Sequence, residues 1–289
     1  REWWENQDSV TLITRPRRFG KTLNMSMTEY FFSVNYSDMG QYFKELSIWK
    51  EERFREIQGT YPVISLSFAD IKATTYESAR MSIIRKLVRL YSAFDFIRSS
   101  EALNEKDRTY FDSVGEDMSD DAAAVGINYM SDYLSRYYGE KVIILLDEYD
   151  TPLQEAYVHG YWEELTAFIR SLFNSTFKTN PYMERGLLTG ITRVSKESIF
   201  SDLNNLEVVT TTSEKYSTSF GFTEEEVFTV LENAGIPEEK ADVISKNYDT
   251  KAKMLSEFQR GKTISLYKEK QAEKNSKYNT IVKEPEVKM

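Results

Sequence analysis

Four short apolar runs, rich in β-branched residues, divide the 289-residue chain, and they predict buried strands at 10–13, 62–68, 142–146 and 186–194. Between these runs, apolar residues recur at helical spacing. Continuous apolar strands that alternate with helices are typical of a parallel sheet covered on both sides. The pattern therefore predicts an α/β fold, with a mostly parallel sheet and helices on both faces.

The helix after the first strand should begin at Lys21 and bury one apolar stripe against the sheet, formed by Leu23, Met27, Tyr30 and Phe31. Two further helices are expected, around residues 83–91 and 127–134. Between them lies a polar segment, roughly Ser99 to Asp121, with high charge and poor apolar periodicity. This segment, 99–121, is a candidate insertion or lid.

A basic loop joins the first strand to its helix and ends in Gly20-Lys21-Thr22. The phosphate-loop pattern is G-x-x-x-x-G-K-[ST], and Arg15 stands where the pattern has its first glycine. In such loops backbone N–H groups surround an anion, the lysine reaches the outer phosphates and the hydroxyl binds Mg²⁺. A second Gly-Lys-Thr at 261–263 follows polar residues, so we interpret it as accidental. The first copy lies between strand and helix and predicts a nucleoside triphosphate ligand.

The run 142–146 is followed directly by Asp147-Glu148, the pattern of a Walker B strand. Ligands of open α/β sheets bind outside the carboxyl ends of the strands, so these carboxylates can meet a phosphate loop at the end of a neighbouring strand. Asp147 would hold Mg²⁺, mostly through water, and Glu148 would polarise the attacking water. Asp150 is expected to fix the turn that follows. The alternative is that the three acidic residues only begin an exposed turn.

The strand at 186–194 ends in Thr192 and Arg193. A hydroxyl or guanidinium beside the acidic strand can sense the terminal phosphate or offset charge in the transition state. A plain threonine at a strand end and a surface arginine explain the same residues equally well.

Four blocks of the chain, at 14–23, 146–152, 188–205 and 220–227, resemble in order and spacing the AAA-ATPase-like family of bacterial P-loop proteins. That family carries Arg-Pro-Arg-Arg-Phe-Gly-Lys-Thr, which stands here at 15–22, so the resemblance accounts for Arg15. It implies a P-loop NTPase three-layer sandwich, with ATP as the nucleotide and Mg²⁺ beside it. Many members continue into a nuclease-like domain of the PD-(D/E)XK type, whose acidic and lysine residues we do not find after a strand here.

Motifs and resemblance together give the expected site. The catalytic candidates are Glu148, Lys21 and Arg193, and the Mg²⁺ candidates are Thr22 and Asp147. The residues expected to bind the nucleotide are Arg17, Arg18, Phe19, Gly20, Lys21, Thr22, Leu23 and Thr192. Whether the two arginines of the loop contact phosphate or pack on neighbours stays open.

Composition narrows the class of protein. With 40% hydrophobic residues the chain can bury one substantial core, expected over 1–249. No apolar run approaches the ~20 residues that span a bilayer, and no apolar leader opens the chain, so we expect a cytoplasmic protein and no membrane contact. The absence of cysteine excludes disulfides and cysteine-based sites.

Charge is distributed unevenly along the chain. Residues 251–289 carry ten Lys/Arg and five Asp/Glu, so a charged helical or disordered tail is expected at 250–289. The rest of the chain is net acidic, which argues against broad nucleic-acid binding by the core. The basic tail leaves nucleic acid as an open question, and a homo-oligomer is also left open.

The expected function is Mg²⁺-dependent ATP hydrolysis. An ATP-binding switch or interaction module with little or no hydrolysis is the alternative, and phosphotransfer to a small hydroxyl substrate is a third. Glu148 favours hydrolysis, because a protein that only binds ATP does not need it.

Overall fold

The computed structural model describes residues 1–192, 199–200, 203, 205–221 and 223–233. The chain forms two compact units, Arg1–Gly221 and Phe222–Met289. In the second unit, helix α9 (Glu224–Asn233) is preceded by a reciprocal cap. The N–H of Thr223 donates to the Glu226 carboxylate at 2.7 Å, and the N–H of Glu226 donates to Thr223 Oγ1 at 3.2 Å. The predicted boundary at 249/250 and the basic tail lie outside the described residues.

The first unit is built on five parallel strands in the order β2-β3-β4-β1-β5. The strands are β1 (Val10–Thr14), β2 (Val63–Ser67), β3 (Val142–Asp147), β4 (Met183–Gly190) and β5 (Leu206–Val209). This sheet confirms the predicted α/β fold.

Strand β4 lies between the loop strand β1 and the acidic strand β3, pairing with both of them. Leu188 is the register partner of Leu12 on one side and of Leu146 on the other. The prediction that the phosphate loop and the acidic pair follow neighbouring strands is therefore wrong. The two motifs are separated by one strand width, about 4.8 Å more than direct neighbours would be.

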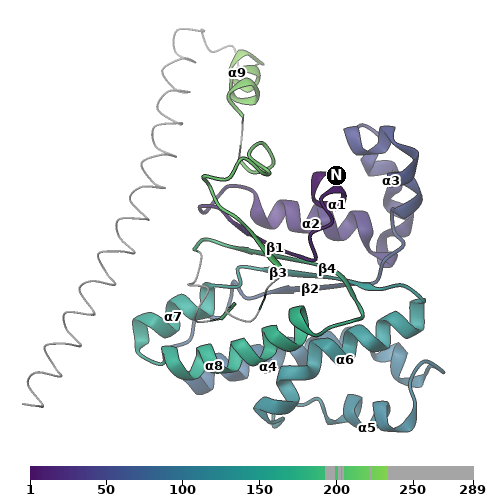
Figure 1. The fold of residues 1–289 in the computed structure, drawn as a ribbon, viewed down its shortest axis with the longest axis vertical. Helices are drawn as coiled ribbons and strands as arrows, with labels where there is room; N and C mark the ends of the chain where they lie inside the picture. The colour runs from purple at the N-terminus through teal and green to yellow at the C-terminus, as the bar shows by residue number, and fades with distance from the viewer. Residues whose placement is uncertain (193–198, 201–202, 204, 222, 234–289) are drawn as a thin grey trace, which may run out of the picture. The chain divides into compact units, whose positions relative to one another are not determined.

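Helices cover both faces of the sheet, which gives three layers (Figure 1). On one face lie α1 (Glu2–Glu5), α2 (Lys21–Phe32) and α3 (Glu52–Ile57), and on the other α4 (Tyr76–Ala93), α6 (Asp120–Tyr138), α7 (Thr151–His159) and α8 (Trp162–Phe173). The connections include the 3₁₀ helices η1 (Val34–Phe43), η2 (Ser47–Lys50) and η3 (Asp95–Ser99), and the π-helix η4 (Asn174–Lys178). None of the helices in the described part of the chain has the length and apolar character to cross a membrane.

Each face of the sheet has its own apolar core, because successive side chains of a strand point to opposite faces. Along β3, Ile143 and Leu145 pack into the cluster on the α2 side. Ile144 and Leu146 pack into the larger cluster on the other face. Burial on both faces explains why the sequence of this strand is apolar without interruption.

Helix α2 begins at Lys21 as predicted, but it buries a different face. Of the predicted stripe only Phe31 is buried, whereas Leu23, Met27 and Tyr30 are exposed, Leu23 to 64%. The buried face includes Lys21 itself, and Met25 and Phe32 follow it at helical spacing, together with Phe31. The predicted stripe is therefore wrong: the helix turns Lys21 toward Glu148 at the end of β3, and most of the more regular apolar series lies on the opposite, exposed side.

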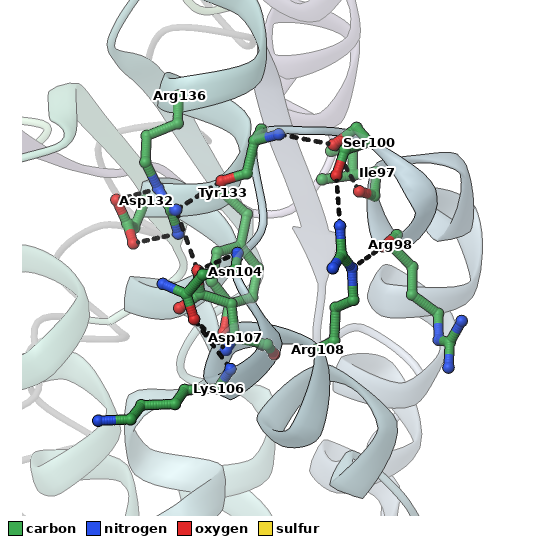
Figure 2. Close-up of polar contacts among 11 residues, drawn as sticks. Ile97, Arg98, Ser100, Asn104, Lys106, Asp107, Arg108, Asp132, Tyr133 and Arg136 are labelled. Carbon is green, nitrogen blue, oxygen red and sulfur yellow. Dashed lines mark hydrogen bonds and ion pairs between the residues drawn. The ribbon is translucent and has the colours of Figure 1, made fainter.

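The segment at 99–121, predicted as a polar insertion or lid, contains helix α5 (Glu105–Ser113). Asn104 and Asp107 form a capping box at its start, and Arg136 of α6 donates to the Asp107 carboxylate at 3.0 Å (Figure 2). Its apolar residues Leu103, Phe111 and Met118 are buried in the larger core. Their irregular spacing, across a loop, a helix and a second loop, left no periodic signal in the sequence.

Phe111→Ala tests whether this segment is a fixed part of the core. The Phe111 side chain is 6% exposed and packs on the Tyr91 ring, so we expect its truncation to lower the free energy of unfolding by about 3–5 kcal/mol. Phe96→Ala is the matched control, since that ring is 48% exposed and should cost less than about 1.5 kcal/mol. Equal losses in urea unfolding of the two variants would show that α5 does not share the core.

Candidate functional site

The carboxyl ends of β1, β3 and β4 gather one basic loop and three acidic residues, Asp147, Glu148 and Asp150, at the same edge of the sheet. Residues 15–20 connect β1 to α2, and Gly20 is the N-cap of that helix. Gly20 has φ 75° and Arg18 has φ 69°, so the loop visits the left-handed region twice. Glycine adopts this conformation without strain, whereas Arg18 holds it at a cost of about 1–3 kcal/mol.

The ammonium group of Lys21 is enclosed between the loop and the acidic strand. It donates to the carbonyl oxygen of Pro16 at 3.2 Å and forms an ion pair with Glu148 Oε1 at 3.3 Å. The side chains of Lys21 and Glu148 are only 3% and 18% exposed. The predicted phosphate-binding lysine and the predicted water-activating carboxylate are therefore brought into direct contact.

Asp147 connects the loop helix to the central strand. Its Oδ2 accepts a hydrogen bond from Thr22 Oγ1 at 2.7 Å, and its Oδ1 accepts one from the Thr189 hydroxyl. Asp147 and Thr189 are both buried. Thr189 was not among the predicted site residues, although it is a lone polar residue near the end of the apolar run 186–191.

Glu148 stands in a sharp turn at the end of β3. Its φ is 53°, a left-handed conformation that costs a residue with a Cβ about 1–3 kcal/mol. The turn is held by the N–H of Tyr149, which donates to the Thr189 carbonyl at 3.0 Å, and by the N–H of Thr151, which donates to the Glu148 carbonyl at 3.1 Å. The strained turn fixes the direction in which the Glu148 carboxylate leaves the strand.

Asp150 is fully buried and fixes the end of β4 to this turn. Its carboxylate accepts from the N–H of Thr192 and from the Thr192 hydroxyl, both at 2.7 Å, and from the N–H of Ile191 at 3.1 Å. Gln154 of α7 also donates to it, at 2.8 Å. The Thr192 hydroxyl, predicted to contact the nucleotide, is thus engaged by Asp150.

Gly190 makes this close approach of β3 and β4 feasible. A Cβ atom built on it would lie 2.6 Å from Tyr149 Cε1 and 2.7 Å from Asp150 Oδ1. Either distance is far inside van der Waals contact, so the position requires glycine.

The remaining predicted residues differ in exposure, and so does Arg15, which was not itself predicted as a site residue. Arg17, Arg18 and Leu23 are exposed, and Phe19 is partly buried. Arg15 is 4% exposed, and its burial lowers the pKa of its guanidinium. Arg193 lies outside the described residues.

The site has the donors that a Mg²⁺ ion beside a phosphate requires. Mg²⁺ keeps several waters and takes one or two protein oxygens in addition to phosphate oxygens. Adjacent ligands of an octahedral ion with bonds of about 2.1 Å lie about 3 Å apart, close to the 2.7 Å between Thr22 Oγ1 and Asp147 Oδ2. Within the described ranges, no three His, Cys, Asp or Glu residues are grouped as a metal cage. The donor set fits an ion that arrives with phosphate.

Comparison with known proteins agrees with this geometry. The family model described as "Predicted AAA-ATPase" matches residues 3–200. A relative from Azotobacter chroococcum mcd 1, described as an uncharacterized protein in the vnfD 5' region, is 26% identical over 229 residues. The match covers 78% of this chain and 38% of the relative, so the chain spans well under half of that protein's length. No solved structure matches the chain.

The family match includes the loop strand, the acidic strand and β4, and therefore every element that builds the site described above. The chain belongs to the predicted AAA-ATPase family.

Proposed function

We propose that this chain binds ATP with Mg²⁺ at the loop 15–22 and hydrolyses its β–γ phosphate bond. The observation that carries the proposal is the convergence of Lys21, Thr22, Asp147 and Glu148, which join two segments 125 residues apart in the chain. We propose ATP as the nucleotide because the chain belongs to a family of predicted ATPases.

In the proposed complex the triphosphate lies at the N-terminus of α2, where free backbone N–H groups and the helix dipole favour an anion. The ammonium group of Lys21 leaves the Glu148 carboxylate and pairs with the outer phosphate oxygens instead. The exposed guanidinium groups of Arg17 and Arg18 are available to the same phosphates. Thr22 and Asp147 would hold a Mg²⁺ ion, which would offset negative charge on the phosphate groups.

The partner exchange of Lys21 frees Glu148 for chemistry. The carboxylate orients a water molecule in line with the γ-phosphorus and takes its proton. The water oxygen forms a bond to phosphorus as the bond from phosphorus to the β–γ bridging oxygen breaks, and ADP and phosphate leave. Because the backbone turn at Glu148 is fixed, the carboxylate can adopt few orientations, which lowers the entropy cost of aligning it with the water molecule.

One observation favours the alternative, an ATP-binding switch with slow hydrolysis. Lys21 and Glu148 neutralise one another at 3.3 Å, in a place where both are largely removed from water. Binding of the nucleotide must break this pair, which costs part of the binding energy. Such a site can hold ATP and respond to it even where turnover is low.

Substitution of the two paired residues separates binding from turnover. Lys21→Ala should weaken ATP binding by about 10- to 100-fold, because one charge-assisted contact to phosphate is lost. Glu148→Gln should bind ATP at least as tightly as wild type, because the ion pair that the nucleotide must break is absent, and it should lower kcat by about 10²- to 10⁴-fold. Calorimetric binding and phosphate release measure the two effects.

The matched controls are Lys106→Ala and Glu116→Gln, because both residues are exposed and lie outside the candidate site. Glu148→Gln that turns over ATP as fast as wild type would refute the catalytic role. Tight binding without turnover by the wild-type chain would establish the switch, and a phosphorylated small hydroxyl compound in place of free phosphate would establish phosphotransfer.

Thr189→Val tests whether the hydrogen bond from Thr189 holds Asp147 in position as a Mg²⁺ ligand. The variant keeps the β-branched shape but removes a hydrogen bond from the buried Asp147 carboxylate, so the free energy of unfolding should fall by about 1–3 kcal/mol. The Mg²⁺ concentration for half-maximal turnover should rise about tenfold. Thr189→Ser, which retains the hydroxyl, is the control. If turnover by Thr189→Val had the same Mg²⁺ dependence as wild type, Thr189 would have no role in supporting Asp147 as a Mg²⁺ ligand.

A further inference from the structure

Arg15, which replaces the first glycine of the phosphate-loop pattern, holds three backbone carbonyls. Its guanidinium donates to Thr14 at 3.0 Å and to Val209 and Tyr216 at 3.4 Å each. The guanidinium carbon also lies 5.4 Å from the centre of the Phe220 ring, within the range of a cation–π contact. The side chain therefore joins the start of the phosphate loop to a segment about 200 residues further along the chain.

We name this segment, residues 216–221, the strap; it makes one further contact with the loop and one with the start of α2. The N–H of Gly221 donates to the Phe19 carbonyl at 3.1 Å, and Asn24 in the first turn of α2 donates to the Ser219 carbonyl at 3.0 Å. Gly221 has φ 85°, and a Cβ atom on it would lie 3.0 Å from the Phe19 ring. The strap thus braces the phosphate loop near its beginning, near its end and at the start of the helix.

The charge of Arg15 is not cancelled by its surroundings. In the described part of the chain no carboxylate lies within ion-pair distance of it, and burial is the cause of its lowered pKa. Carbonyl dipoles and an aromatic ring stabilise a cation without neutralising it. A positive charge held away from water at the start of the loop attracts an anion bound there more strongly than an exposed one does.

We propose that Arg15 is a positioning residue that joins the phosphate loop to the strap, so that a bound nucleotide and an ordered strap stabilise one another. The inference rests on the proposed nucleotide binding. If the strap must be in place for the loop to hold its shape, then by thermodynamic linkage the nucleotide must also hold the strap in place. The strap ends at Gly221, where the next residue begins the second unit, so nucleotide binding would be transmitted to the backbone that enters that unit.

The test is hydrogen–deuterium exchange of the Gly221 amide in the full chain, with and without AMP-PNP and Mg²⁺, together with the Kd for AMP-PNP. In wild type we expect the nucleotide to slow exchange of this amide at least fivefold, because its hydrogen bond to Phe19 is reinforced. In Arg15→Gln we expect that protection to disappear and the Kd to rise at least fivefold. Arg85→Gln, which removes a guanidinium from an exposed ion pair with Glu116, is the matched control and should resemble wild type.

Gly221→Ala keeps Arg15 and strains the strap, so it should also weaken AMP-PNP binding and reduce the protection. If Arg15→Gln loses its far-ultraviolet circular dichroism signal and is therefore unfolded, Gly221→Ala tests the same link between the strap and the nucleotide. An Arg15→Gln variant that binds AMP-PNP like wild type would overturn the inference, and so would a wild-type strap whose exchange does not respond to nucleotide. Wild-type protein that binds no AMP-PNP would instead refute the proposed function, and the inference with it.

Discussion

The geometry of the candidate site depends on the hydrogen bonds that the buried Asp147 carboxylate accepts. This carboxylate accepts hydrogen bonds from Thr22 at the start of α2 and from Thr189 at the end of β4, and so unites three elements that are distant in the sequence. A buried charge is stable only when hydrogen bonds surround it, and these two hydroxyls supply them. The same contacts hold the start of α2 against the ends of β3 and β4.

Strain and close contacts around this carboxylate fix the remaining groups. Glu148 holds a left-handed backbone conformation, and Gly190 lets Tyr149 and Asp150 approach β4 more closely than any side chain would permit. Asp150 then holds the end of β4 by its backbone N–H groups. Unfavourable local conformations are retained where the surrounding contacts determine them, and their concentration at this edge agrees with a site built for chemistry.

The sequence predicted the sheet, the loop and the acidic pair because each has a local signature. The apolar run before Asp147 and the Gly-Lys-Thr after a strand can be read from adjacent residues. The position of β4 between β1 and β3 could not be predicted in this way, because the order of parallel strands is decided by crossovers and packing rather than by the strands themselves. The lone Thr189 in an apolar run marked a polar position, but its partner Asp147 follows from the strand order and could not be read from the sequence.

Helix α2 buries a face that its periodic apolar pattern did not predict. Leu23, Met27 and Tyr30 form the more regular apolar series, yet the helix turns Lys21 toward the strand ends and leaves that series exposed. Arg15 could not be explained from the sequence. The family resemblance showed that an arginine is usual at this position, but not what its side chain contacts. The reason is seen only when the carbonyls of Val209 and Tyr216 are placed beside it.

When nucleotide binds, we expect Lys21 to exchange its ion pair with the Glu148 carboxylate for contacts with the triphosphate. A crystal structure of the chain with AMP-PNP and Mg²⁺ tests it most directly. We predict that Lys21 Nζ will lie within hydrogen-bond distance of a phosphate oxygen and beyond 4 Å from the Glu148 carboxylate, with a water molecule between Glu148 and the γ-phosphorus. A complex in which the 3.3 Å pair of Lys21 and Glu148 persists and the nucleotide lies away from residues 15–22 would contradict the account.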